Sequence, residues 1–300
     1  MPPAIEPRPR PARFPDCDIL RVPAGPGAMY VERYGHGGPA VVLLHGFGTS
    51  AFLWRRVAPE LAVAGMTAYA IDLLGHGASD RPAGAGFDVR SQSTCIAHVL
   101  RDLEVASATV VGCDLGAAVA LGLALESPTA VSRLVLVSPS PLRGTPGPDI
   151  RLMQRESARH LARLVRGLFG AHPLIGVLLR NAMSDRGALD DRLVGRYVAP
   201  YVGRDGLNHF LTLAKSVEED DLSWIEPAVV PQPALVLHGD ADRWCSSADA
   251  AELAAALQRA SGECVEGSGR LIPEEQPEFL ARRIVAHARA PEPERSVSAS

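Results

Sequence analysis

The sequence predicts an α/β fold in which helices flank a mostly parallel sheet. The first indication is an alternation of strand-length apolar runs with segments whose apolar residues have helical spacing. The second is a pattern of strand, sharp turn and helix at residues 109–118. The third is the stretch 138–227, where helical patterns follow one another without a buried strand. Alternating strands and helices are typical of a parallel sheet covered on both faces, so we expect one such domain with a helical insertion.

The 300 residues divide into one predicted domain and two predicted tails. Proline is dense in residues 1–16 and again in residues 291–300, and proline lacks the amide hydrogen that helices and sheets need. We therefore expect both ends to be mobile tails. Residues 17–290 are expected to fold as one domain with a helical cap over residues 139–227. An apolar fraction of 47% is enough for a large buried core.

The sheet is predicted to begin with two short strands, 19–22 and 29–34, which a turn rich in proline and glycine separates. A short turn joins neighbouring strands, so this pair is expected to be antiparallel. Among the later strands, residues 40–44 form a continuous apolar run of the kind that is buried on both faces of a sheet. Further strands are expected at residues 67–73, 109–111, 131–137 and 234–242, with a short one at 262–266, which gives about eight strands.

Helices are predicted between these strands and in the insertion. Helical spacing of apolar residues occurs at 53–64, 89–105, 248–260 and 274–288, and after the sharp turn up to residue 125. The insertion has four further helical patterns, at 153–168, 174–183, 190–201 and 207–217. The predicted architecture is therefore an eight-stranded, mostly parallel sheet flanked by helices, with an inserted helical cap.

Composition and charge argue against several classes of partner. The formal net charge is −4 without long runs of like charge, so the sequence offers no basic surface for nucleic acid or an anionic membrane. No apolar run reaches the roughly 18 residues of a membrane span, and the N-terminus lacks the apolar core of a signal peptide. The five cysteines lack the paired spacing of a metal or redox site. We expect a cytoplasmic protein that binds a small molecule, with no metal and no cofactor.

The stretch Thr109–Ala118 carries the main functional signal. Three β-branched residues lead into Gly112, Cys113, Asp114, Leu115 and Gly116, and small residues then open a helix. This layout is typical of a nucleophile elbow, a strained turn that lifts its middle residue above the sheet. The flanking glycines allow the turn and the close approach of helix and strand. The middle residue is Asp114, where most such elbows carry serine.

Five segments, in this order, make the chain resemble α/β-hydrolase-fold proteins with a helical cap over roughly residues 17–290. His45–Gly48 resembles the oxyanion-hole segment of that family, and Asp72–Gly77 resembles its D-x-x-G-x-G loop. The elbow at Gly112–Gly116 is the third segment. His238–Asp242 resembles the strand end that presents the catalytic acid, and Gly267–Phe279 resembles the segment that carries the catalytic histidine. One fold hosts many reactions, so the function has to be argued from the site.

Asp114 and Arg270 depart from the family's usual serine and histidine. Aspartate at the nucleophile position resembles epoxide hydrolases and haloalkane or haloacid dehalogenases, in which the carboxylate attacks carbon and a histidine-activated water hydrolyses the ester. Arg270 occupies the position of that histidine. A guanidinium stays protonated at any accessible pH and cannot take a proton from water. The resemblance implies a catalytic set of Asp114, Asp242 and Arg270, in which Arg270 either pairs with Asp242 or anchors a ligand.

The resemblance also implies an oxyanion hole and a substrate pocket. The backbone amides of Phe47 and Leu115 are expected to hold a developing oxyanion. Leu115 argues against a dehalogenase, because those relatives usually carry tryptophan there. Tyr197 and Tyr201, four residues apart on a predicted helix, are either proton donors to an opening epoxide or packing residues. The expected pocket residues are His45, Trp244, Tyr197, Tyr201 and His209.

Three functions fit these residues. The first is a cofactor-independent enzyme that acts through Asp114 on an apolar epoxide, ester, lactone or polyketide-like molecule. Because the usual base is missing, isomerisation, cyclisation or elimination is favoured over hydrolysis. The second is a catalytically inactive protein that binds a ligand or partner in the same cleft. The third is a hydrolase in which another histidine, His209 or His238, acts as the base.

Overall fold

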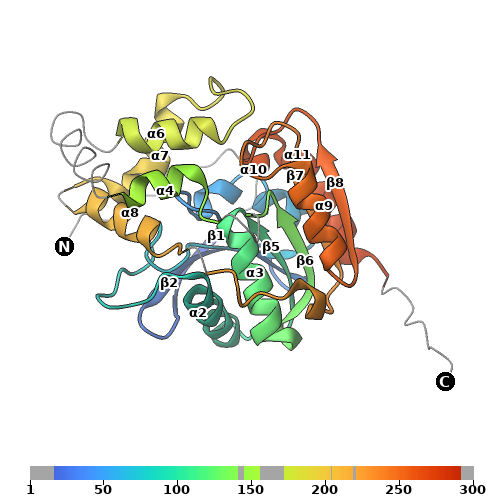
Figure 1. Cartoon of the computed structure of the whole chain (residues 1–300). Coiled ribbons are helices and arrows are strands. Elements are labelled where there is room, and N and C mark those ends of the chain that lie inside the picture. Colours follow the sequence, from blue (N-terminus) through green and yellow to red (C-terminus); the bar gives the residue numbers. More distant parts are fainter. Residues whose placement is uncertain (1–16, 141–144, 156–171, 204, 219–220, 292–300) are drawn as a thin grey trace.

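An eight-stranded sheet forms the centre of the molecule (Figure 1). The computed structural model describes residues 17–140, 145–155, 172–203, 205–218 and 221–291. The strand order across the sheet is β1-β2-β4-β3-β5-β6-β7-β8. β1 (Cys17–Pro23) pairs antiparallel with β2 (Ala28–Tyr34), β2 pairs antiparallel with β4, and the other pairings are parallel. The predicted eight-stranded, mostly parallel sheet is confirmed.

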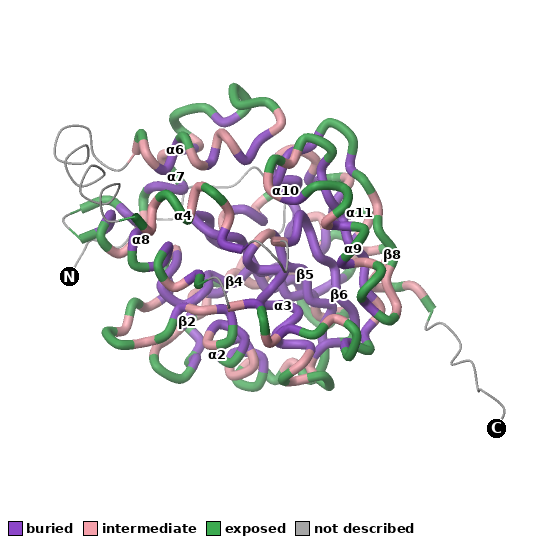
Figure 2. Tube along the Cα trace, viewed as in Figure 1, coloured by how far each residue is buried: buried purple, intermediate pink, exposed green. Residues whose placement is uncertain are grey.

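Apolar runs form most of the parallel strands because both faces of the sheet are covered there. Figure 2 shows buried residues concentrated in the inner strands, whereas the edge strand at residues 260–265 is largely exposed. The strands are β3 (Ala40–Leu44), β4 (Thr67–Ile71), β5 (Ala108–Cys113), β6 (Val131–Val137), β7 (Ala234–Gly239) and β8 (Ala260–Val265). β4 and β7 end earlier than their patterns predict, so Asp72 and Asp242 lie in the loops beyond the carboxyl ends of these strands.

Helices pack on the sheet in separate groups. α2 (Val89–Asp102) packs against α3 (Leu115–Glu126), and α1 (Ala58–Val63) packs against α11 (Pro277–Arg289). α9 (Ser247–Ala256) packs against β7 and β8. α3 is apolar on every side and almost completely buried, which is typical of a helix that neighbours cover all round. This buried helix follows Asp114 directly.

Prolines divide two segments that the sequence pattern predicts as single helices. The segment 274–288 breaks before Pro277, and the segment 53–64 breaks before a helix whose second residue is Pro59. Proline is tolerated in the first turn of a helix but has no amide hydrogen to continue a helix that precedes it. Before Pro277 the backbone also leaves the helical region, with φ −135° and ψ 56° at Gln276. The short pieces that result are the 3₁₀ turn η1 (Ala51–Trp54) and the one-turn helix α10 (Ile272–Glu275).

Helices also form the insertion between β6 and β7, where the described residues contain no strand. Figure 1 shows them together beyond one end of the sheet. They are α4 (Pro148–Gln154), α6 (His172–Asn181), α7 (Asp191–Val198), η3 (Ala199–Tyr201) and α8 (Gly206–Lys215). Two further 3₁₀ turns, η2 (Pro128–Ala130) and η4 (Pro227–Val229), lie outside this group. Most of the predicted helix 153–168 lies outside the described residues, as do the predicted tail 1–16 and residues 292–300 of the other tail.

Candidate active site

Asp114 lies at the sharp turn between β5 and α3. Its backbone has φ 55° and ψ −120°, a strained conformation for a residue with a side chain. Two glycines make the turn possible. A Cβ on Gly112 would lie 2.2 Å from the Gly116 carbonyl oxygen, and a Cβ on Gly116 would lie 2.4 Å from the Leu44 carbonyl oxygen. The backbones are too close for side chains at these positions, and Asp114 is presented at the carboxyl end of β5.

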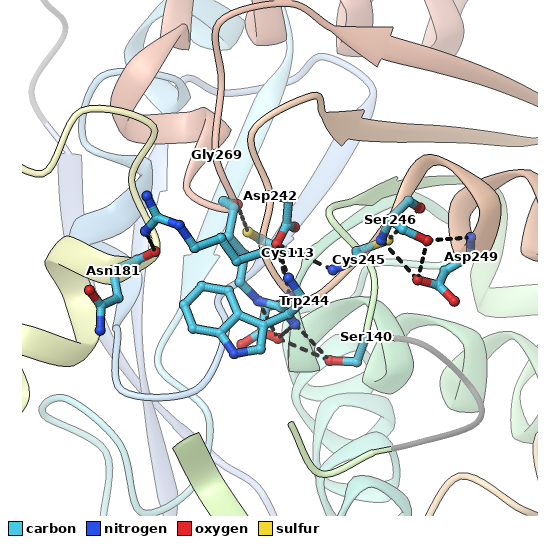
Figure 3. Close-up of polar contacts among 12 residues, drawn as sticks. Cys113, Ser140, Asn181, Asp242, Trp244, Cys245, Ser246, Asp249 and Gly269 are labelled. Carbon is cyan, nitrogen blue, oxygen red and sulfur yellow. Dashed lines mark hydrogen bonds and ion pairs between the residues drawn. The ribbon is translucent and has the colours of Figure 1, made fainter. Parts of the chain in front are cut away.

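Arg270 comes from the loop between β8 and α10 and reaches Asp114. Its Nε donates a 3.0 Å hydrogen bond to Asp114 Oδ1, and its Nη2 donates to the same oxygen. Its Nη1 lies 3.5 Å from Oδ1 of Asp242. Figure 3 shows the surroundings of this cluster, with Asp242, Trp244 and Ser140 labelled. The guanidinium therefore lies between two carboxylates whose side chains are 14% (Asp114) and 0% (Asp242) exposed.

The two carboxylates keep Arg270 charged. Burial by itself lowers the pKa of an arginine, because it removes the water that stabilises the cation. The charges of Asp114 and Asp242 outweigh this effect and raise the pKa of Arg270 above its usual value. A guanidinium in this state donates hydrogen bonds and does not accept a proton. A step that needs a base therefore has to use another group.

Two further groups donate hydrogen bonds to the carboxylate of Asp114. The backbone amide of Phe47 donates to Oδ2 at 2.9 Å, and the Ser140 hydroxyl donates to Oδ1 at 2.9 Å. Ser140 Oγ in turn accepts a 3.2 Å hydrogen bond from Nη2 of Arg270. The Phe47 amide, which the sequence predicts as an oxyanion donor, thus holds an oxygen of Asp114 itself. Within the described part of the chain the Leu115 amide has no hydrogen-bond acceptor.

Asp242 lies on the far side of the cluster. Its Oδ1 accepts hydrogen bonds from the backbone amides of Trp244 at 2.8 Å and Cys245 at 3.3 Å. Its Oδ2 and Nη1 of Arg270 are buried without a hydrogen-bond partner among the described residues. The indole of Trp244 lies against the guanidinium, with Cζ of Arg270 5.3 Å from the ring centroid, a cation–π contact. Asp242 therefore holds the cation mainly by charge.

A cavity of about 120 Å³ lies beside Asp114 and Arg270. Its lining comes both from the carboxyl end of the sheet and from the insertion, so the insertion covers the site. The apolar residues that the insertion contributes are Pro146, Pro148, Ile150, Leu178, Leu179, Ala182 and Val217. Trp244 adds an aromatic wall. A ligand in this cavity meets a mostly apolar surface with polar groups gathered around Asp114.

His45, predicted as a pocket residue, is a buried structural residue instead. Its Nε2 accepts a 3.0 Å hydrogen bond from the Leu73 amide, so Nδ1 carries the hydrogen and donates to the Gly46 carbonyl oxygen at 2.8 Å. Burial lowers the pKa of His45 to about 4. Because both ring nitrogens have partners in the protein and the residue does not line the cavity, the expectation of a pocket role is corrected.

Tyr197, Tyr201 and His209 are also absent from the cavity lining, which corrects their predicted place in the pocket. The Tyr197 hydroxyl donates to the buried carboxylate of Glu274. The Tyr201 hydroxyl is buried and has no hydrogen-bond partner among the described residues. His209 Nε2 lies 2.6 Å from a carbonyl oxygen of the loop at residues 72–77. The helices of the insertion direct these side chains into packing contacts and not toward Asp114.

A replacement base is not found among the described histidines. His209 Nε2 contacts the Gly75 carbonyl oxygen, and His238 Nε2 lies 3.0 Å from the Ser247 hydroxyl. Neither residue lines the cavity, and no other described histidine does so. His160 falls outside the described residues. Hydrolysis through His209 or His238 therefore lacks support from the site geometry.

The described residues offer no group of three or more histidine, cysteine, aspartate or glutamate side chains arranged to hold a metal ion. The helices in these same ranges are too short or too polar to cross a bilayer. The five cysteines are free thiols, and burial raises the pKa of Cys113, the residue before Asp114. The polar side chains that line the cavity are Thr49, Asp114, Ser140, Thr145, Asp149 and Arg270.

Sequence reasoning missed Ser140 and Asp149. Ser140 follows β6, the neighbour of β5, and the carboxyl ends of neighbouring parallel strands meet at one edge of the sheet. That position was therefore a usable signal. Asp149 lies in the first turn of α4 and lines the cavity, without an ion pair in the part of the chain that is described. Nothing in its sequence surroundings indicates this role.

Comparison with known proteins assigns the family. A family model for the alpha/beta hydrolase fold matches residues 39–277. The uncharacterised protein Rv2715 of Mycobacterium tuberculosis is 32% identical over 211 residues, which are 70% of this chain but only 56% of that protein. The esterase Rv0045c of the same species is 30% identical over 279 residues, 88% of this chain and 86% of the esterase. The solved structure of Cfl2 from Burkholderia cenocepacia matches with a TM-score of 0.80 at 24% identity, over 92% of this chain and 99% of that one. The chain therefore belongs to the α/β-hydrolase family.

Proposed function

We propose that this chain is a cofactor-independent enzyme of the α/β-hydrolase family that acts on an apolar small molecule beside Asp114. The observation that carries the proposal is the cluster of Asp114, Arg270 and Asp242 at one end of an apolar cavity. Mostly apolar hollows with a few convergent polar groups are the usual form of small-molecule sites. The matching esterase favours esters and lactones as substrates, and the aspartate at the nucleophile position adds epoxides.

The bound molecule is proposed to be uncharged near the cluster. Arg270 already faces Asp114 and Asp242, so it is not available to anchor a ligand carboxylate. Asp149 places a further carboxylate in the cavity wall. Across these four residues negative charge is in excess, and an anionic ligand would meet like charge in a partly desolvated site. A neutral epoxide, ester or lactone avoids this repulsion.

Asp114 is proposed to act on the ligand in steps that need no activated water. Attack of its carboxylate on an epoxide carbon would form an alkyl ester and break the carbon–oxygen bond, and the released oxygen would take a proton from solvent. Hydrolysis of this ester needs a base, and Arg270 is not one. Isomerisation, cyclisation and elimination add no water, so they have no such requirement. The expected products therefore have the same mass as the substrate, or a lower mass where a group is eliminated, and none has gained the mass of a water molecule.

Product analysis tests this proposal. The full chain is incubated with panels of epoxides, esters and lactones, and both products and intact protein are examined by mass spectrometry. We expect a rearranged product or an alkyl ester on the wild-type protein and neither with Asp114→Asn, which keeps the shape of the side chain but removes its charge. Asp191→Asn, a substitution at an 83% exposed side chain, is the matched control and should behave as wild type. Full turnover by Asp114→Asn would refute the role of Asp114.

A ligand-binding protein without catalysis is the second candidate function, and the contacts of Asp114 favour it. Four hydrogen bonds from Phe47, Ser140 and Arg270 occupy both carboxylate oxygens, which weakens a nucleophile. The variant Arg270→His separates the two functions by restoring an imidazole beside Asp114. New esterase or epoxide-opening activity would show a site that is intact except for its base. Ligand binding with no product in either protein would favour the binding function.

A further inference from the structure

The loop that carries Arg270 lies directly against the helical insertion. α6 ends at Asn181, and the residues that follow it run beside this loop. The backbone amide of Arg270 donates to the Ala182 carbonyl oxygen at 2.7 Å. A Cβ on Gly269 would lie 2.6 Å from that carbonyl oxygen and 2.7 Å from the Ser184 amide nitrogen. Two main-chain segments far apart in the sequence are therefore in contact, with no room for a side chain between them.

Glu275 joins the same two segments through its carboxylate. Its Oε2 accepts a 2.7 Å hydrogen bond from the Gly269 amide. Its Oε1 accepts a 2.7 Å hydrogen bond from the Ser184 amide and a second hydrogen bond from the Ser184 hydroxyl. Hydrogen bonds to an ionised acceptor are stronger than those between neutral groups. The carboxylate thus closes a link between the insertion and the residue that precedes Arg270.

We propose that Glu275 is a positioning residue for Arg270. Glu275 does not line the cavity. By holding Gly269 against Ser184 it fixes the backbone from which the Arg270 side chain extends, and so keeps the guanidinium between its two carboxylates. The insertion then supports the site as well as covering it. This role goes beyond the proposed function, because it concerns the placement of Arg270 whether or not Asp114 performs chemistry.

The emission of Trp244 reports the position of the guanidinium without any substrate, because its indole packs against Arg270. Acrylamide quenching is measured on the full chain of each variant and on the same variant with Trp244→Phe added. The second protein emits only from Trp54 and Trp224, so subtracting its signal from the first leaves the emission of Trp244. We expect Glu275→Ala to increase the quenching to the level of Arg270→Gln. Glu275→Gln keeps the shape and one acceptor oxygen and should give a smaller increase.

Glu278→Ala is the matched control, since Glu278 lies on α11 and makes an exposed ion pair with Arg56. It should leave the quenching unchanged. Ser184→Ala removes one donor to Glu275 and should give a partial increase. Wild-type quenching in Glu275→Ala, or in Glu275→Gln and Ser184→Ala if the alanine variant does not fold, would overturn the assignment. The measurement uses no substrate, so its failure is distinct from a failure of the Asp114→Asn test.

Discussion

Arg270 shows how a single side chain changes the steps that a site permits. A histidine at this position would exchange a proton with water, because its pKa lies near neutrality. Arg270 keeps a positive charge between Asp114 and Asp242 but cannot transfer a proton. With arginine here, the site has a fixed positive charge and no proton acceptor at this position. As a consequence, the buried carboxylate of Asp242 and the largely buried carboxylate of Asp114 both depend on one cation.

We predict that Arg270→Leu lowers the free energy of unfolding by about 3–5 kcal/mol, because Asp114 and Asp242 then remain buried without a counter-ion. Urea unfolding at neutral pH measures this loss. Adding Asp242→Asn to the variant should recover part of it, since one of the two unpaired charges is removed. A loss below about 1 kcal/mol would show that the cluster is no stronger than a surface ion pair.

His45 gives a prediction for pH. Burial lowers its pKa in the folded state to about 4, below the ordinary value of 6.5, so the unfolded chain takes up the proton first. The contribution of His45 to stability is therefore complete above pH 6.5 and is lost as the pH falls from 6.5 toward 4. We expect His45→Gln to have a flatter stability profile than wild type over this interval. Urea unfolding at several pH values checks it, and parallel profiles would contradict the account.

The residues of the cluster were predictable from the sequence, but their hydrogen bonds were not. Asp114, Asp242 and Arg270 follow strand ends in the order of the family's motifs, which is why their convergence was expected. The Phe47 amide donates to Asp114 only because of the side-chain rotamer of this aspartate, and the sequence pattern carries no information on rotamers. The position of Ser140 after β6 was a usable signal, but a hydroxyl after a strand is too common to single this residue out.

At the scale of the element, the elbow between β5 and α3 depends on glycine where backbones touch. We predict that Gly116→Ala destabilises the fold by more than about 3 kcal/mol or prevents folding, because a Cβ there meets the carbonyl oxygens of Leu44 and His45 at 2.4 and 2.6 Å. Gly195→Ala on α7 is the matched control. A Cβ at Gly195 has nothing within 4 Å, and alanine should stabilise that helix by about 0.5–1 kcal/mol. Thermal unfolding measures both, and equal effects would refute the steric account.

The two tyrosines of α7 and η3 form a second matched pair. Tyr197 donates to Glu274, which also pairs with Arg55, so Tyr197→Phe removes a bond to a buried charge. We expect it to cost about 1.5–3 kcal/mol. Tyr201 has no partner for its hydroxyl in the described structure, so Tyr201→Phe should change stability by less than about 0.5 kcal/mol. Urea unfolding compares them, and a larger loss for Tyr201→Phe would contradict the assigned contacts.

Periodicity predicted that α6, α7 and α8 exist, but not what their side chains contact. A helical pattern identifies the apolar face of a helix, but that face can either line a ligand cavity or pack in a core. Tyr197 and Tyr201 were therefore compatible with either surrounding until the arrangement of the insertion was known. Pro59 in the first turn of α1 and Pro277 at the start of α11 were visible in the sequence, and the break before Pro277 follows from the restricted backbone of the residue before proline.

At the scale of the whole molecule, the sheet and the insertion share the construction of one site. The sheet presents Asp114 and Asp242 at its carboxyl end, as expected for parallel strands, and the insertion supplies apolar wall residues. The loop of Arg270 contacts both parts, through Asp114 on one side and through Ala182 on the other. The chain therefore keeps the family's fold, and a cation lies between Asp114 and Asp242 at the centre of the site.

We propose that Asp114 and its neighbours do not activate water, and incorporation of oxygen from the solvent is the sharpest check of this proposal. Wild type and Arg270→His are incubated with the same epoxide or ester in water enriched in heavy oxygen, and products and intact protein are analysed by mass spectrometry. We expect no heavy oxygen in any product or adduct of the wild-type protein, and clear incorporation with Arg270→His. Heavy oxygen in the wild-type product, lost in Asp114→Asn, would contradict it.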